Sequence, residues 1–231
     1  MNYETVIGLE IHVQLKTQSK LFCGCSTRSA YERDVPPNRH ICPICTGHPG
    51  VLPRPINRKA VELAVRLASA VRSSIHPESD FDRKNYFYAD LPKGYQITQH
   101  GKPLAEGGFI DFILDGIDQG IDLNHMHLEE DPGKSKIEGG VWLVDMNRCG
   151  VPLVEIVTQP DLRSASEAAA FVTEFRRIIR YLGVSEGNME MGNLRCDANV
   201  SIRPSSSDPL GVKTEIKNLN SIRFLEDAVN W

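Results

Sequence analysis

The sequence predicts an α+β fold, with a largely antiparallel sheet and flanking helices, in one domain that spans residues 1–231. Three observations predict it. Segments with strand character outnumber helical ones, the two kinds do not alternate regularly as they do in a doubly wound fold, and three segments alternate apolar and polar residues with period two. The chain has 231 residues, 41% of them hydrophobic, and can bury a substantial core.

The first alternating segment, Val6–Leu15, predicts a strand with one face on the core and the other face open. The open face carries Gly8, Glu10, His12 and Gln14, so a carboxylate lies next to an imidazole. A half-solvated antiparallel strand whose polar face meets water gives the same alternation. The pattern alone leaves both interpretations open.

Two later strands repeat this alternation. In the segment 194–203 the open face carries Arg195, Asp197, Asn199, Ser201 and Arg203. In the segment 213–217 it carries Lys213, Glu215 and Lys217. Acids interleaved with basic and amide side chains on several strands are what a sheet needs to hold Mg²⁺ and polyphosphate.

Four of the six cysteines fall in one loop, at about residues 21–50. Two close pairs separated by about sixteen residues match the layout of a tetrahedral zinc site with four thiolates, namely Cys23, Cys25, Cys42 and Cys45. His40 or His48 could each replace one sulfur, and disulfides are the competing interpretation. We expect structural zinc, because nothing marks the chain as secreted. Cys149 and Cys196 stand alone and are expected to be buried thiols.

Capping and turn signals place the remaining elements. Asn57–Arg72 has apolar residues at helical spacing, and the capping box at Ser164–Glu167 begins a helix that runs to Leu182 and ends at Gly183. Residues 109–123 predict a hairpin that turns at Asp115-Gly116. From Ser221 an amphipathic helix begins without a cap or tail, so we expect the chain to be a piece of a longer protein.

Composition excludes several classes of protein. The net charge of −4 gives no overall basic character, so a nucleic-acid partner would need a local patch. No apolar run reaches transmembrane length and residues 1–5 lack the features of a signal peptide, so we expect a cytoplasmic protein. Gly133-Lys134-Ser135 lacks the first glycine of a phosphate-binding loop, because that position holds Leu128.

One segment mixes aromatic with basic residues. The side chains of Phe81–Gln96 are suited to stacking on a base or ribose and to contact with phosphate. An aromatic-rich strand and turn without a ligand would have the same composition.

Several longer motifs resemble the B subunit of the glutamine-dependent aspartyl/glutamyl-tRNA amidotransferases. The related archaeal E subunit shares the first motif and is the minor alternative. The resemblance covers essentially the whole chain, and the motifs that carry it are Gly8–His12, Asp82–Tyr88, His127–Asp131, Val144–Ile156 and Leu194–Asn199.

The resemblance implies an ATP-dependent carbon–nitrogen ligase with glutamine as amido donor, whose fold is similar to the glutamine synthetase and guanido kinase catalytic domains. In this family the domain uses ATP and Mg²⁺ to phosphorylate the side-chain carboxylate of Glu-tRNA(Gln) or Asp-tRNA(Asn). Ammonia from the amidase, which is the A subunit, then displaces the phosphate, and the small C subunit holds the pair together. The tRNA-binding C-terminal regions would lie beyond Trp231.

The resemblance also implies site residues. The positions associated with the metal and phosphate site are Glu10, His12, Glu129, Glu130, Asp197 and Glu215, of which we expect Glu10, His12, Glu130 and Asp197 to hold Mg²⁺. From residue type we expect phosphate contacts from Arg195, Lys213 and Lys217, and substrate contacts from Lys84, Tyr86 and Tyr88. Only some family members have the four cysteines, which favours a structural role for zinc.

Two other functions compete with this one. A zinc-stapled RNA-binding module could share the scaffold without any chemistry, but acids placed together would repel phosphate unless a cation intervened. A small-molecule kinase or ligase of the glutamine synthetase type would need no tRNA and no ammonia-producing partner.

Overall fold

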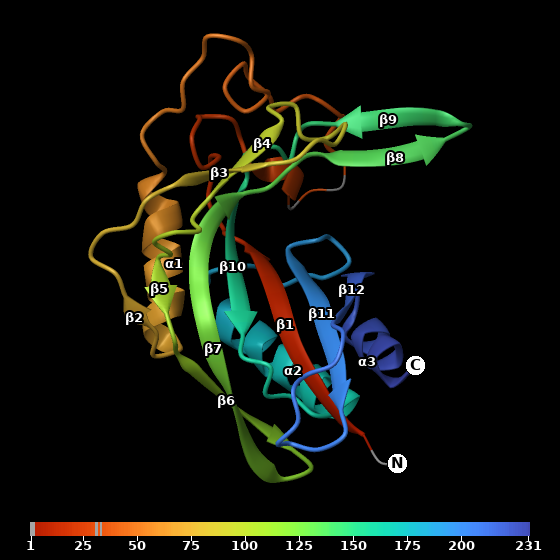
Figure 1. The fold of residues 1–231 in the computed structure, drawn as a ribbon. Helices are drawn as coiled ribbons and strands as arrows, with labels where there is room; N and C mark the ends of the chain where they lie inside the picture. The colour runs from red at the N-terminus through yellow and green to blue at the C-terminus, as the bar shows by residue number, and fades with distance from the viewer. Residues whose placement is uncertain (1–2, 31, 33) are drawn as a thin grey trace.

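The computed structural model describes residues 3–30, 32 and 34–231 (Figure 1). Met1 and Asn2, and Tyr31 and Arg33 of the expected cysteine loop, lie outside the described residues. Over the described ranges, the main sheet has eight strands, and every pairing in it is antiparallel. Its order is β12-β11-β1-β10-β7-β5-β2, with β6 paired to β7. The strand bounds are Glu4–Gln14 (β1), Ser74–Ile75 (β2), Ala105–Glu106 (β5), Phe109–Leu114 (β6), Ile117–Glu130 (β7), Pro152–Thr158 (β10), Leu194–Arg203 (β11) and Thr214–Leu219 (β12).

Three α-helices occur in the described part of the chain, and a side chain caps the start of each. α1 (Arg58–Ala70) begins after Asn57, and α2 (Ala165–Tyr181) begins after Ser164, whose hydroxyl accepts from the Glu167 amide. Both predicted helices are confirmed. α3 (Ile222–Asn230) was expected to lack a cap, but the Ser221 hydroxyl accepts a hydrogen bond of 3.0 Å from the Phe224 amide. The expectation was therefore wrong at the beginning of this helix.

The core lies between one face of the sheet and the helices. The apolar residues of β1, such as Ile7, Leu9 and Ile11, are fully buried together with Phe171 and Phe175 of α2. In Figure 1 the helices lie along one side of the curved sheet. Because successive strand residues point to opposite faces, packing this face leaves Glu10 and His12 on the other.

The hairpin β6–β7 turns where the sequence predicts. Asp115 and Gly116 both have positive φ, at 52° and 78°, as a two-residue turn that matches the twist of the strands requires. β7 then runs the length of the sheet and brings residues 125–130 to the end where the small sheets lie (Figure 1).

Two small hairpins stand at that end of the main sheet (Figure 1). One pairs β3 (Asp82–Asn85) with β4 (Tyr95–Thr98), and β4 also contacts β7. The other pairs β8 (Lys134–Glu138) with β9 (Val141–Asp145) and projects from the body. A short 3₁₀ helix, η1 (Arg28–Ala30), lies in the cysteine loop. The mixed α and β composition and the antiparallel main sheet confirm the predicted α+β class.

Among the described residues, no helix combines the length and the apolar character needed to span a bilayer.

Candidate functional site

The polar face of the main sheet aligns side chains from four neighbouring strands. β1 lies between β10 and β11, so His12 is directly opposite Arg195 on one side and Glu155 on the other. Glu155 in turn lies opposite His127 of β7. The sheet register therefore brings together residues that are more than one hundred positions apart in the sequence.

Three of these side chains form a group with the spacing of metal ligands. His12 Nε2 lies 3.5 Å from Glu129 Oε1 and 3.2 Å from Glu155 Oε2. One ligand atom from each residue lies within 4.8 Å of the other two. An imidazole nitrogen and two carboxylate oxygens suit a divalent cation such as Mg²⁺ or Mn²⁺. This group is named the His12 group below.

A second imidazole supports the same group. His127 Nε2 lies 3.6 Å from Glu155 Oε2 and 3.8 Å from Glu129 Oε2. Its Nδ1 is buried and has no hydrogen-bond partner within the described part of the chain. An unsatisfied buried polar atom is uncommon in folded proteins.

The charges of the His12 group depend on one another. Burial raises the pKa of Glu155, but the hydrogen bond from His12 and the charges of His12, His127 and Lys84 outweigh it and lower the pKa to about 2. Burial lowers the pKa of His12, yet the hydrogen bond to Glu155 and the charges of both carboxylates raise it overall. The concentrated negative charge therefore attracts a proton to His12, as it would attract a metal ion.

Two further acids lie beside this group. Glu10 on β1 is directly opposite Asp197 on β11, and its Oε1 accepts a hydrogen bond of 2.9 Å from Asn199 Nδ2. Like charges directly opposite each other on one face destabilise a sheet. Such a pair is expected where a cation or a positively charged group offsets the repulsion.

A cleft of about 540 Å³ opens over these residues. Its lining includes Glu10, His12, Glu129, Glu155, Arg195, Asp197 and Lys217 from the sheet, and Lys84, Tyr86 and Tyr88 from β3 and the loop after it. The Tyr86 hydroxyl donates to Gln96 Oε1 at 2.9 Å, which fixes the ring against β4. A neighbouring cavity of about 690 Å³ shares Glu10, Lys84, Glu129 and Glu155 with the cleft. Glu10, Glu129 and Glu155 thus lie between two open spaces.

The structure does not bring three of the expected residues to the cleft. Glu130 follows Glu129 in the strand and is turned the other way, where it pairs with Lys93, accepts from the Ile97 amide and lines a cavity beside the cysteine loop. Lys213 lines a third cavity, of about 230 Å³, which shares Glu10 with the cleft. Glu215 is exposed and its Oε1 lies 2.9 Å from Lys217 Nζ.

Sequence reasoning missed Glu155 as a site residue. The signal was present, because Glu155 is the one charged residue in the apolar strand Pro152–Thr158, which is paired on both sides. A charged carboxylate is almost never buried in the middle of such a strand unless it has a partner or a ligand.

The four clustered cysteines form a second group with metal-ligand spacing. One Sγ atom from each lies within 4.8 Å of the others, and none of these cysteines is in a disulfide in the described chain: Cys23, Cys25, Cys42 and Cys45. The fully buried Lys20 donates from Nζ to Cys45 Sγ at 3.3 Å and to the His40 carbonyl at 2.7 Å. The Cys42 amide also points at Cys45 Sγ, at 3.3 Å.

These contacts favour thiolate at Cys45. A hydrogen bond from the Cys23 thiol, helped by the charge of Lys20, lowers the pKa of Cys45 to about 4 against the opposing effect of burial. The expected Cys₄ metal site therefore has both its ligands and a counter-charge in place. Cys149 and Cys196 are buried outside this group, as expected, and burial raises the pKa of both thiols.

Comparison with known proteins gives the family. Residues 5–231 match the model of the GatB/GatE catalytic domain. The chain belongs to that family. Its relatives include the B subunit of the aspartyl/glutamyl-tRNA(Asn/Gln) amidotransferase of Thermodesulfovibrio yellowstonii, which is 55% identical over 100% of the chain and 48% of the relative. The proteins of the same name from Pseudothermotoga lettingae and Moorella thermoacetica are each 52% identical over the whole chain, covering 49% and 48% of the relatives.

The matched region of this GatB/GatE catalytic domain contains both ligand groups and the cleft. The chain spans about half the length of the curated relatives it matches.

Proposed function

We propose that this GatB/GatE catalytic domain is the part of a glutamine-dependent tRNA amidotransferase that activates the amino-acid side chain. The relatives are named as the B subunit of an aspartyl/glutamyl-tRNA(Asn/Gln) amidotransferase. The His12 group in a wide polar cleft is the observation that carries the proposal. The substrates would be Glu-tRNA(Gln) and Asp-tRNA(Asn), in which the side-chain carboxylate of the attached amino acid becomes an amide.

In the proposed reaction the side-chain carboxylate attacks the γ-phosphorus of ATP, forming an acyl phosphate and releasing ADP. Ammonia then attacks the acyl carbon, phosphate leaves, and the amide forms with loss of a proton. When bound, Mg²⁺ would offset the charge of the phosphate oxygens during transfer.

The residues of the cleft fit distinct parts of this reaction. His12, Glu129 and Glu155 would hold the divalent cation, with Glu10 and Asp197 beside it. Glu130 is left out of the ligand set because its side chain lies against Lys93, on the side of the cysteine loop. Arg195 and Lys217 line the cleft and would contact phosphate oxygens, whereas Lys213 and Glu215 lie outside it.

The opposite wall of the cleft suits the substrate end. Lys84 Nζ lies 5.9 Å from the centroid of the Tyr86 ring, and Tyr88 packs edge-on against Tyr86 with centroids 5.8 Å apart. A cation beside aromatic rings can hold a substrate carboxylate near the phosphate donor while the rings support the ribose.

The proposal extends to partners and setting. The amidase, as the A subunit, would supply ammonia, the small C subunit would hold the assembly together, and the complex would work in the cytoplasm. The domain would share the architecture of glutamine synthetase and the guanido kinases, and the cysteine group would hold structural zinc.

The test is ATP hydrolysis by the complex reassembled from full-length subunits, with and without Glu-tRNA(Gln). We expect ATP hydrolysis that depends on the charged tRNA and on Mg²⁺, and glutamine should supply the amide nitrogen of the product. Binding of tRNA without any ATP turnover would instead support the zinc-stapled RNA-binding module. Turnover that ignores tRNA would support a small-molecule ligase.

A further inference from the structure

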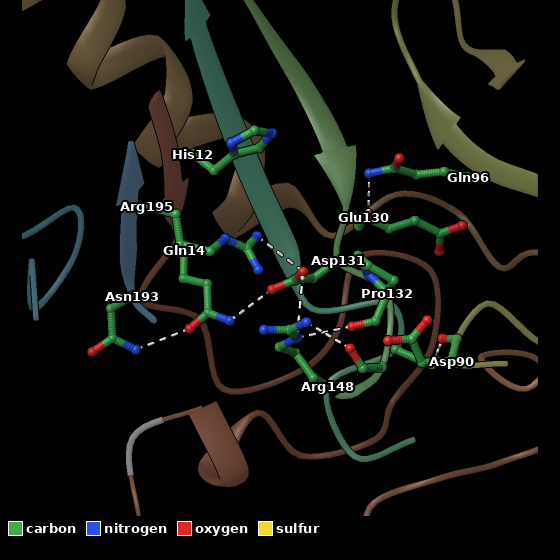
Figure 2. Close-up of polar contacts among 12 residues, drawn as sticks. His12, Gln14, Asp90, Gln96, Glu130, Asp131, Pro132, Arg148, Asn193 and Arg195 are labelled. Carbon is green, nitrogen blue, oxygen red and sulfur yellow. Dashed lines mark hydrogen bonds and ion pairs between the residues drawn. The ribbon is translucent and has the colours of Figure 1, made fainter. Parts of the chain in front are cut away.

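A buried carboxylate lies directly behind the cleft. Asp131 follows the last residue of β7 and its side chain is fully buried. Asp131 Oδ2 accepts from Gln14 Nε2 at 2.8 Å, and its Oδ1 lies 3.0 Å from Arg195 Nη2 and 3.4 Å from Arg148 Nε. Figure 2 shows these side chains converging on Asp131 from different elements.

Two of the three partners are held in place by other groups. Arg148 Nε also donates to the Pro132 carbonyl at 2.9 Å, and its Nη2 donates to the Gly133 carbonyl at 2.5 Å. Gln14 Oε1 accepts from Asn193 Nδ2 at 2.9 Å. These contacts fix the carboxylate from behind (Figure 2).

Arg195 is the partner that reaches the cleft. It lines the cleft and lies directly opposite His12 in the sheet register. Burial lowers its pKa, but the charge and hydrogen bond of Asp131, followed by the charges of Glu129 and Asp197, raise it overall. Arg195 therefore has three acids within electrostatic reach, and Asp131 is the one that binds it.

We infer that Asp131 is a positioning residue that draws the Arg195 guanidinium back from the acids of the cleft and leaves Glu129 and Asp197 free for a divalent cation. A guanidinium released from Asp131 would pair with those acids, because an arginine fork binds carboxylates strongly. It would then compete with the cation. This inference rests on the proposed cation site, and it assigns a role to a residue that touches neither cation nor substrate.

The experiment uses the assembled complex, with the B subunit at full length, and measures Mn²⁺ binding by electron paramagnetic resonance, without ATP or tRNA. Asp131→Asn keeps the shape of the side chain but removes its charge. We expect Mn²⁺ to bind about tenfold more weakly, the range typical of residues that orient metal ligands. The Mg²⁺ concentration for half-maximal ATP hydrolysis should rise to a similar extent.

Thr158→Val is the matched control, because it removes a buried hydroxyl that accepts a hydrogen bond of 3.0 Å from the Leu9 amide, outside the Asp131 network and the cleft lining. We expect it to lower Tm and leave the Kd for Mn²⁺ unchanged.

The double variant separates positioning from support of the fold. Without the guanidinium, in Arg195→Met, nothing is left to compete, so adding Asp131→Asn should weaken Mn²⁺ binding no further. Equal weakening by Asp131→Asn in both backgrounds, or an unchanged Kd in the single variant, overturns the inference.

Arg195→Lys is the second route if Asp131→Asn does not assemble. Lysine keeps the positive charge but loses the Nη2 group that contacts Asp131 Oδ1, so we expect weaker Mn²⁺ binding, and an unchanged Kd overturns the inference. If the wild-type complex binds no Mn²⁺ and hydrolyses no ATP, the proposed function itself fails. If the wild-type complex binds Mn²⁺ and hydrolyses ATP, and Asp131→Asn has the same Kd for Mn²⁺, only the role of Asp131 is refuted.

Discussion

The cysteine group and the His12 group place their ligand atoms within the same spacing, and both mix buried with half-buried residues, yet their surroundings differ. Cys23 and Cys45 are buried, and Lys20 and a backbone amide point at the Cys45 sulfur. His12 and Glu155 instead line a wide cleft, and Glu155 also lines the neighbouring cavity. We call the His12 group the open group, because a ligand can reach it through the cleft, and the cysteine group the closed group, because four thiolates would complete the shell of a zinc ion.

The chemistry of the ligands follows the same division. Four thiolates complete the shell of a zinc ion and leave no position for a substrate, which is typical of structural sites. One imidazole and two carboxylates leave positions open for phosphate oxygens. The difference teaches that ligand spacing alone does not separate stability from chemistry, whereas access and donor type do.

The largest effect is expected in the open group. Glu155→Gln keeps the size of the side chain and removes the charge that holds the cation. We expect amidation and tRNA-dependent ATP hydrolysis to fall by more than about a hundredfold, since partners that only orient metal ligands are already worth 10–100-fold. The glutaminase activity of the amidase should persist. Steady-state assays of the reassembled complex measure both.

Glu138→Gln is the control for that variant. Glu138 is an exposed acid of the β8–β9 hairpin, paired with Lys136 and absent from the cleft lining. It should retain activity. Full amidation by Glu155→Gln would show that the His12 group is not the cation site.

The closed group is expected to affect stability first. Cys42→Ser removes one thiolate from a kind of site whose metal contributes about 10–16 kcal/mol in small zinc domains. We expect zinc content to fall below one per chain and Tm to drop by roughly 5 °C or more, which is about 2 kcal/mol for a domain of this size. Metal analysis and calorimetry measure these. Cys196→Ala, outside the quartet, should retain its zinc, and unchanged zinc in Cys42→Ser would exclude this ligand set.

The two groups were not equally accessible to prediction from sequence. The cysteines are close in the chain, so their spacing alone identified the site. The pairing of Glu10 with Asp197 joins residues 187 positions apart and depends on β1 lying beside β11, which period-two alternation does not encode. Alternation could still have separated Glu129 from Glu130, because adjacent strand residues face opposite ways.

The helices and the 115–116 turn were predictable because capping and turn residues act locally. Glu155 and Asp131 were missed for the opposite reason. Each is defined by partners from distant strands, such as His12 for Glu155 and Arg195 for Asp131.

A smaller effect is expected from the counter-charge of the closed group. Lys20→Met keeps the apolar stem and removes the ammonium that contacts Cys45 Sγ. We expect zinc affinity to fall about tenfold, as it does when other side chains that hydrogen-bond to a metal ligand are removed. Zinc should still bind at saturation. Competition with a chelator measures it. Lys16→Met is the matched control, because Lys16 pairs with Glu186 at the surface. Equal affinity in both variants would mean that Lys20 does not balance the thiolates.

The smallest change in Tm is expected at an ion pair remote from both groups. This pair shows how much stability an ordinary ion pair contributes. Glu4 Oε2 lies 2.5 Å from Arg203 Nε, and the hydrogen bond from Arg203 lowers the pKa of this carboxylate. A carboxylate whose pKa is lowered by folding stabilises the protein above its unfolded pKa, and this stabilisation is lost as pH falls through the folded pKa. Glu4→Gln should therefore lower Tm slightly near pH 7, with a difference from wild type that disappears in acid. Calorimetry at several pH values measures it, and a difference that grows as pH falls would reverse the sign of this linkage.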